Sequence, residues 1–430
     1  MGATSFLRRL LGGAAGSIER KVHELLSLCE SLLAESGEYA STALARDALA
    51  AYQELDDPLR AQFFDALAQH YSPSPEAVTA AAAAYQGDPS SPNLLRLESA
   101  VEPARRELFR RLNMAPGGTA ALVEMRRQVL AGLQAHSEWR LIDVDLMHLL
   151  RSWFNRGFLR LERIDWRSPA SLLEKLIQYE AVHAIEGWRD LRRRLEADRR
   201  CFAFFHPQLP DEPIIFIEVA LTRGMSSQVQ PLLDIRSPVA PPQKADCAMF
   251  YSITNCQEGL RGISFGNQLI KQVAEDLKRE FPHLRRFATL SPIPGFRAWL
   301  GKAGPREILA RIEHPAWHLG DVPETLSRDL QRLCAYYLLQ VKQNGEPLDP
   351  VARFHLGNGA ALERLNWMAD TSEQGIARSA GMMVNYVYWL AEVEGNHQRY
   401  FHEHAITASP LVEKLASECP LAMQEKGAAA

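Results

Sequence analysis

No apolar run in this 430-residue sequence approaches the ~18–20 residues that a helix needs to cross a bilayer. The densest run, residues 214–221, already includes Glu218, so we expect no membrane span. Basic residues are not in excess either, because 48 lysines and arginines stand against 52 acidic residues, for a formal net charge of −4. Binding to a nucleic-acid backbone is therefore not expected. A small anionic ligand would need only local positive charge.

Cysteines are few and widely separated. None of the six forms a C-x-x-C pair, which argues against a disulfide framework and against a structural zinc site. His397, His402 and His404 gather near the C-terminus without H-E-x-x-H spacing, so we expect a solvated helix there and no metal site. The short basic start lacks a long apolar core. Together with the alanine and arginine richness, this favours a bacterial cytoplasm over an organellar matrix.

The first part of the chain is predicted to be helical. Apolar residues recur there at spacings of three and four, as on one stripe of an amphipathic helix: Val22, Leu25, Leu26, Cys29, Leu32 and Leu33. Further helices are predicted over 44–70, interrupted near Pro58, and over 77–85, 93–112 and 119–135. Short-looped helices without strand signals predict a helical bundle over residues 1–155. We expect this bundle to be an oligomerisation domain, because its apolar stripes exceed what so thin a bundle buries alone.

The pattern becomes strand-like farther along the chain. Residues 201–206, 214–221, 247–253 and 286–290 are rich in β-branched and aromatic side chains, and a helix is predicted over 267–281. Antiparallel strands followed by a strand, a glycine loop, a helix and a strand indicate an α+β fold. We therefore predict a mixed α+β domain over 156–420, with a C-terminal tail over 421–430.

A glycine-containing loop precedes the predicted helix. Gly259, Gly262 and Gly266 allow a tight turn and close approach to a ligand. Amides at the start of a helix suit phosphate, and Arg261 adds a formal charge. Taken alone, the pattern is as typical of a plain tight turn as of a phosphate-binding loop.

The spacing Arg261-x-x-Ser264-x-Gly266 resembles the pyrophosphate loop of the GCN5-related acetyltransferase superfamily, which binds coenzyme A. Ser264 replaces a glycine of the usual pattern. The resemblance implies a coenzyme A-binding segment made of Arg261, Gly262, Ile263, Ser264, Phe265, Gly266 and Asn267.

Other segments resemble the malonyl-CoA decarboxylase family, over roughly residues 150 to 400. They are residues 204–207, 218–221, 290–296, 332–336, 352–360, 365–370 and 383–388. The resemblance implies a carboxy-lyase that converts malonyl-CoA into acetyl-CoA and carbon dioxide through a thioester enolate. It also implies a homo-oligomer, either a dimer or a tetramer. The family uses no metal, biotin, pyridoxal phosphate or thiamine, and coenzyme A is part of the substrate, so no separate cofactor is expected.

Three catalytic residues are implied by the same resemblance. Ser291 matches the serine of the family's L-S-P-I-P-G motif, and it would otherwise read as a turn serine before proline. Its role is open between binding the malonyl carboxylate and relaying a proton. His355 matches the histidine of F-H-L-x-N-G, and without this motif it would be interpreted as a histidine of the protein core. A pKa near neutrality would suit a histidine that donates a proton to carbon. Tyr388 matches a tyrosine near the substrate, and it could equally be an aromatic packed on a helix face.

Ser264 also marks a departure from the family. Some members carry a glutamate at this position, and neither Glu258 nor Glu218 can be given its role from the sequence. Two alternatives to the decarboxylase remain: a CoA-dependent acyltransferase of the same fold and a non-catalytic CoA-binding regulator. The joint presence of Ser291 and His355 in their motifs argues against the regulator.

Overall fold

The computed structural model describes residues 20–263 and 269–422. They divide into two compact units. The first contains the chain up to Leu159 together with residues 206–212 and 257–263, and the second contains the remainder. Within the two described ranges, no helix is both long and apolar enough to span a membrane.

The first unit is helical, as predicted. Its α-helices are α2 (Arg20–Ala34), α3 (Glu38–Gln53), α4 (Asp57–His70), α5 (Pro75–Gly87), α6 (Ser91–Val101), α7 (Ala104–Leu112), α8 (Gly118–Gly132) and α9 (Arg140–Trp153). The short helices η1 (Ser137–Trp139), η2 (Arg156–Phe158) and η4 (Glu258–Leu260) also belong to it. The stripe predicted on the first helix is buried from Val22 to Leu32, while Leu33 is half-buried.

One predicted helix is wrong in its length. Residues 93–112 form two helices, because the chain leaves the helical conformation at Glu102, whose ψ is 121°. Pro103 follows, and the residue before a proline is disfavoured in the α region. Helix α9 is missing from the prediction, although its buried Ile142, Leu146, Leu149 and Leu150 follow helical spacing.

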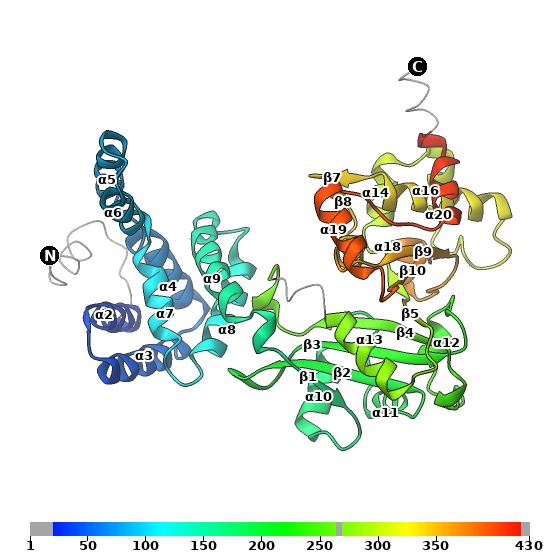
Figure 1. The fold of residues 1–430 in the computed structure, drawn as a ribbon, viewed down its shortest axis with the longest axis horizontal. Helices are drawn as coiled ribbons and strands as arrows, with labels where there is room; N and C mark the ends of the chain where they lie inside the picture. Colours follow the sequence, from blue (N-terminus) through cyan, green and yellow to red (C-terminus); the bar gives the residue numbers. More distant parts are fainter. Residues whose placement is uncertain (1–19, 264–268, 423–430) are drawn as a thin grey trace. The chain divides into compact units, whose positions relative to one another are not determined.

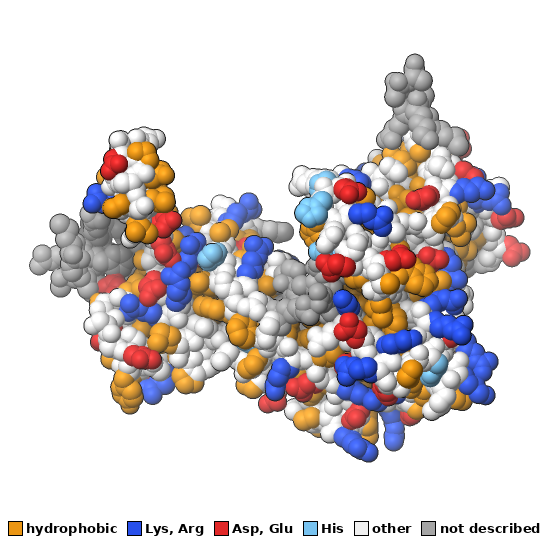
Figure 2. All heavy atoms as spheres, in the orientation of Figure 1, with side chains coloured by type: hydrophobic (Ala, Val, Ile, Leu, Met, Phe, Trp, Pro, Cys, Tyr) orange, Lys and Arg blue, Asp and Glu red, His pale blue; other side chains and the backbone are white. Residues whose placement is uncertain are grey.

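Helices α5 and α6 pack against each other as a hairpin that projects from the other helices of this unit (Figure 1). Helix α6 has no buried residue, and Leu94, Leu95 and Val101 are 40%, 65% and 46% exposed. Hydrophobic side chains are visible on this hairpin in Figure 2. The hairpin thus presents apolar surface that the described part of the chain does not cover.

The second unit is built on a mixed sheet. Its strands run in the order β1 (Arg160–Ile164), β2 (Arg199–His206), β3 (Leu209–Thr222), β4 (Cys247–Asn255), β5 (Arg286–Thr289), β10 (Met383–Val387) and β6 (Ser291–Pro292), with β9 (Ala361–Asn366) also paired to β10. Strand β2 ends and β3 begins within segments that cluster with the first unit. The α+β class and the four predicted strands are confirmed.

Strands β4 and β5 are parallel, with Phe250 opposite Thr289. They are joined through α13 (Leu269–Glu280), close to where the helix is predicted. This strand–helix–strand unit after antiparallel strands is the arrangement expected of an acetyltransferase-like domain. Beyond it, β5 and β6 follow each other along β10, where Ala288 lies opposite Val387 and Ser291 opposite Val384.

The remaining elements complete the second unit. They are α10 (Ala170–Tyr179), α11 (Trp188–Arg194), α12 (Gln230–Leu233), η3 (Pro242–Lys244), α14 (Phe296–Ala303), α15 (Arg306–Arg311), α16 (Glu324–Leu339), the hairpin of β7 (Lys342–Gln343) and β8 (Glu346–Pro347), α17 (Pro350–Gly357), α18 (Glu373–Ser379), α19 (Val393–Glu403) and α20 (Pro410–Ser417). All six cysteines of the chain are buried. Of the histidine group, His397 and His402 lie on α19, and Nδ1 of His397 is 2.7 Å from the Gly357 carbonyl oxygen.

Candidate active site

Ser291 is positioned by the pairing of two strands of the second unit. It begins the two-residue strand β6 and pairs with Val384 of β10. The chain then turns through Pro292–Gly295 into α14. The side chain is buried, so its hydroxyl must find partners within the protein.

His355 is positioned by the short helix α17. Asp349 caps this helix, because its Oδ1 accepts hydrogen bonds from the backbone N–H groups of Val351 at 3.0 Å and Ala352 at 2.9 Å. Pro350 occupies the first helical turn, where the missing N–H costs no hydrogen bond. The His355 imidazole is 3% exposed and stacks on the Tyr386 ring, with centroids 4.6 Å apart.

The three predicted catalytic side chains are joined by hydrogen bonds. Nε2 of His355 lies 2.9 Å from Oγ of Ser291, and Nδ1 lies 2.8 Å from the Tyr388 hydroxyl. Tyr388 directly follows strand β10, so it does not sit on a helix face. Residues separated by 64 and 33 positions in sequence thus form one continuous chain of polar groups.

A fourth residue extends this chain. The Ser291 hydroxyl donates to Oγ1 of Thr289 at 2.8 Å, and Oγ1 of Thr289 also accepts the Tyr386 N–H at 3.2 Å. Thr289 is fully buried. Its place could have been inferred from the sequence, because residues two apart along an extended chain share a face.

Burial decides the protonation of the site. It lowers the pKa of His355 to about 3 and raises the pKa of Tyr388 well above its usual range. The near-neutral histidine pKa expected from the sequence is therefore wrong, because the ring is buried and stacked on Tyr386. Both groups are neutral at physiological pH. With Ser291 donating to Thr289, Nε2–H of His355 donates to Ser291 and the Tyr388 hydroxyl donates to Nδ1.

Asn385 holds the strands that carry the site. Its Nδ2 donates to the Thr289 carbonyl at 2.8 Å and to the Ser226 carbonyl at 3.2 Å. Its Oδ1 accepts from Nε of Arg364 at 3.0 Å and from Nδ2 of Asn366 at 2.9 Å. This fully buried amide therefore makes four hydrogen bonds that fix β9 and β10 against the segment ending in Ser291.

The glycine loop is described only in its first part. Gly262 has φ of +80°, which glycine adopts without strain, and Arg261 is exposed while Ile263 is buried. The predicted ligand-binding residues Ser264, Phe265, Gly266 and Asn267 lie outside the described residues. Gly259 has a different explanation from the expected one, since a Cβ there would clash with the Val123 carbonyl of α8. Close packing against α8 accounts for a glycine at this position.

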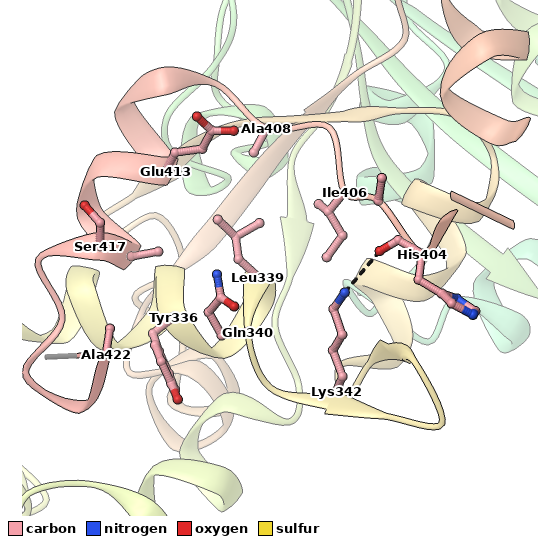
Figure 3. A pocket seen from close by; sticks show the side chains of 12 residues that line it. Tyr336, Leu339, Gln340, Lys342, His404, Ile406, Ala408, Glu413, Ser417 and Ala422 are labelled. Carbon is pink, nitrogen blue, oxygen red and sulfur yellow. Dashed lines mark hydrogen bonds between the residues drawn. The ribbon is translucent and has the colours of Figure 1, made fainter. Parts of the chain in front are cut away.

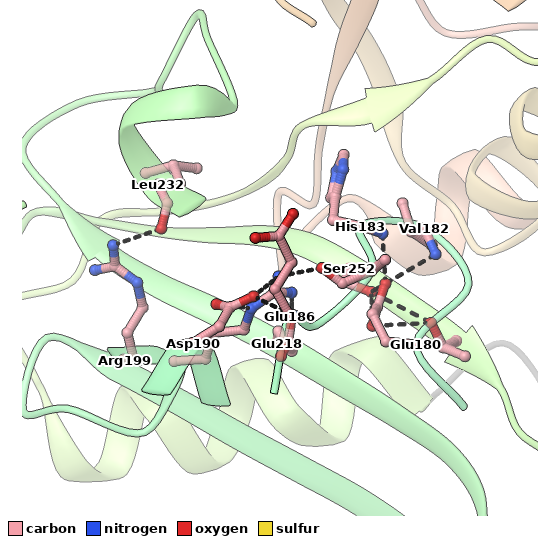
Figure 4. A network of polar contacts seen from close by, with 12 residues as sticks. Glu180, Val182, His183, Glu186, Asp190, Arg199, Glu218, Leu232 and Ser252 are labelled. Atoms are coloured by element: carbon pink, nitrogen blue, oxygen red, sulfur yellow. Dashed lines mark hydrogen bonds and ion pairs between the residues drawn. The ribbon is translucent and has the colours of Figure 1, made fainter. Parts of the chain in front are cut away.

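Glu218, one of the two carboxylates considered beside the site, is engaged elsewhere in the second unit. It is 1% exposed and lies 2.9 Å from Nη1 of Arg194, which also binds Asp190 (Figure 4). Burial raises the pKa of Glu218 to about 7, and Arg194 opposes that rise. Nearby, the Glu180 carboxylate accepts hydrogen bonds from the Ser252 hydroxyl. Glu218 therefore belongs to a buried ion-pair network.

An open hollow of the second unit lies away from these residues. It has a volume of about 630 Å³ and is formed by α16, α20 and the segments around Lys342 and His404 (Figure 3). The Lys342 ammonium group donates to the His404 carbonyl at 3.0 Å across one side of it. Ser291, His355 and Tyr388 are not among its lining residues.

Comparison with known proteins assigns both parts of the chain. Residues 71–154 match the malonyl-CoA decarboxylase N-terminal domain, and residues 157–428 match the malonyl-CoA decarboxylase C-terminal domain. The mitochondrial malonyl-CoA decarboxylase of Anser anser anser is 38% identical over 359 residues, which cover 75% of this chain and 71% of the relative.

Solved structures agree over a larger share of the chain. The malonyl-CoA decarboxylase of Rhodopseudomonas palustris is 49% identical with a TM-score of 0.88, and that of Agrobacterium vitis is 45% identical with a TM-score of 0.85. Each comparison covers 91% of this chain and 99% of the other. By its sequence, by its fold and by the motifs that carry Ser291 and His355, the chain belongs to the malonyl-CoA decarboxylase family.

Proposed function

We propose that Ser291, His355 and Tyr388 carry out the decarboxylation of malonyl-CoA to acetyl-CoA and carbon dioxide. The single observation that carries this proposal is the buried hydrogen-bond chain from Tyr388 through His355 to Ser291. It joins proton-carrying groups in a setting from which water is largely excluded.

The reaction places two demands on the site. The bond between the carboxylate carbon and the methylene carbon breaks, and its electron pair moves into the thioester to form an enolate. The site must stabilise that negative charge and then deliver one proton to carbon. The thioester is the electron sink, so the proposed course needs no metal or organic cofactor.

Among the three hydrogen-bonded residues, Ser291 is the one that contacts the malonyl unit. When substrate binds, the Ser291 hydroxyl turns its proton from Thr289 to the malonyl unit, while its oxygen keeps the hydrogen bond from Nε2–H of His355. An enolate carbon is a much stronger base than imidazole, so a neutral donor can protonate it. The proton passes from the Ser291 hydroxyl to carbon, Nε2–H of His355 reprotonates the Ser291 oxygen, and the Tyr388 hydroxyl protonates Nδ1. This leaves His355 as its Nδ1–H tautomer and Tyr388 as a phenolate, and the return of the imidazole proton to Nε2 with one proton from solvent resets the site. Each turnover therefore consumes one proton.

The coenzyme A moiety is assigned to the glycine loop. The diphosphate binds the segment from Arg261 to Asn267, where Arg261 supplies an exposed cation and Gly262 a backbone that can approach closely. This assignment rests on the resemblance of the loop.

The helical region from 1 to 155 is proposed as the association domain of a dimer or tetramer, with 156–420 as the catalytic domain. The exposed apolar residues of the α5–α6 hairpin support this role. Light scattering should give a smaller assembly for Leu95→Glu than for the unaltered protein. A monomeric unaltered protein at micromolar concentration would contradict the proposal.

We further propose a bacterial cytoplasm as the location. The solved relatives come from bacteria, whereas the matched goose protein is mitochondrial. Fractionation of the native host should recover the protein with cytoplasmic markers.

The decisive experiment supplies malonyl-CoA alone to the purified protein. A decarboxylase releases acetyl-CoA and carbon dioxide in equal amounts without any acceptor. An acyltransferase of the same fold would leave malonyl-CoA intact until an acceptor is added. Ser291→Ala serves as the matched control for release by a contaminant.

A further inference from the structure

A buried arginine of the helical unit contacts the backbone of the glycine loop. Arg126 lies on α8 and is 1% exposed. Its Nη1 donates to the carbonyl oxygens of Gly259 at 2.7 Å and Arg261 at 2.9 Å. Its Nε donates to Oδ1 of Asp143 on α9 at 2.8 Å. All of these residues belong to the first compact unit.

The arrangement makes Arg126 specific for this backbone. A buried guanidinium is unfavourable unless its charge is paired and its donors are used. Asp143 supplies the charge, and the two loop carbonyls accept from the same nitrogen. The planar fork of arginine holds these partners at fixed angles, which a lysine ammonium cannot do.

The same contacts orient the amide groups of the loop. The N–H of a planar trans peptide group points opposite to its carbonyl. Because the Arg261 carbonyl points at Arg126, the Gly262 N–H of that peptide group points away from α8. Gly259 adds a second restraint, since its backbone packs so closely on Val123 that no side chain fits between them.

We propose that Arg126, held by Asp143, is a positioning residue that presents the Arg261–Gly262 backbone to the diphosphate of coenzyme A. This inference rests on the proposed assignment of the diphosphate to the glycine loop. It gives the helical unit a role in substrate affinity besides the proposed association.

The test compares Arg126→Gln with Arg127→Gln. Arg127 is the neighbouring arginine of α8, but its side chain is 44% exposed and pairs with Glu124 at the surface. Each variant is assayed with malonyl-CoA and with malonyl-pantetheine, which carries the same reacting group without the diphosphate.

Losing charge-assisted hydrogen bonds should raise the KM of Arg126→Gln for malonyl-CoA about tenfold, with kcat within about twofold. Its kcat/KM for malonyl-pantetheine should equal that of the unaltered protein, as should every constant of Arg127→Gln. Arg126→Lys should lie between Arg126→Gln and the unaltered protein.

Other outcomes would overturn the inference. An equal loss on both substrates would mean that Arg126 only stabilises the fold, and an unchanged KM would mean that it does not act on the loop. If Arg126→Gln does not fold, Asp143→Asn and Arg126→Lys carry the same comparison. If the unaltered protein does not decarboxylate malonyl-CoA, the proposed function fails by itself. The dissociation constant of free coenzyme A, measured by titration calorimetry, then tests the positioning separately, and it should weaken about tenfold in Arg126→Gln.

Discussion

Two buried polar clusters of the second unit differ in whether the donor and the acceptor of each hydrogen bond can exchange roles. In the network of Arg194, Glu218 and Asp190, the guanidinium can only donate, so the direction of each bond to it is fixed. In the chain of Ser291, His355 and Tyr388, every member can donate and accept. The first cluster can stabilise the fold, and the second can in addition transfer a proton from one residue to the next.

The largest expected effect comes from breaking the second cluster. Ser291→Ala and His355→Asn should each lower kcat by roughly 10²–10⁴, the range for losing a positioned acid–base group. Binding of the product acetyl-CoA should change little. The losses in the double variant should be far from multiplicative, because the residues serve one proton transfer. A near-normal kcat for His355→Asn would show that His355 does not take part in the proton transfer.

Breaking the first cluster should affect stability without affecting the chemistry. Arg194→Met leaves Glu218 and Asp190 buried without their cation, which should lower the free energy of unfolding by about 3–5 kcal/mol. Denaturant unfolding measures this loss, while kcat per folded molecule should stay unchanged. The exposed pair of Arg160 and Glu162 offers a control, since Arg160→Met should lower the free energy by less than about 1 kcal/mol. A large fall in kcat for Arg194→Met would contradict the division of roles.

Thr289 allows a finer division within the proton-passing cluster. Thr289→Val keeps the shape but removes the acceptor of the Ser291 hydroxyl, so kcat should fall up to about tenfold while KM is kept. Thr289→Ser should restore most of the rate. Equal losses in both variants would point to packing of the methyl group.

The smallest effect is expected from pH. Because the pKa of His355 is lowered to about 3, its titration should change kcat by less than about twofold between about pH 6 and pH 8. A kcat limb near pH 6.5 that disappears in His355→Asn would contradict the buried neutral imidazole.

The same shift has a consequence for stability. The unfolded chain protonates His355 below about pH 6.5, whereas the folded protein does so only near pH 3. The unfolded state therefore binds more protons in this window, and the contribution of His355 to stability is lost as pH falls from about 6.5 to about 3. Unfolding midpoints of His355→Asn should depend less on pH over that range.

The elements around the site could be predicted because their signals are local. Strands β2 to β5 and helix α13 follow from runs of β-branched and aromatic residues and from one amphipathic stripe. Ser291, His355 and Tyr388 were found through their flanking motifs, and their mutual hydrogen bonds could not be derived from spacing. The pKa of His355 depends on the burial of its ring, which stacks on Tyr386 of β10, and this is a tertiary feature. The contact between Arg126 and the loop joins residues more than 130 positions apart, so no local sequence pattern predicts it.

Strand β10 has a consequence for how the site forms during folding. Ser291 is placed by Val384, and Ala288 is placed by Val387, which come almost one hundred residues later in the chain. Such distant pairings form slowly, because a long loop must close before they contribute stability. A growing chain can therefore complete its helical unit and its first four strands without acquiring catalytic geometry. Activity should appear late in refolding, after most of the helical circular dichroism has returned, when β10 enters the sheet.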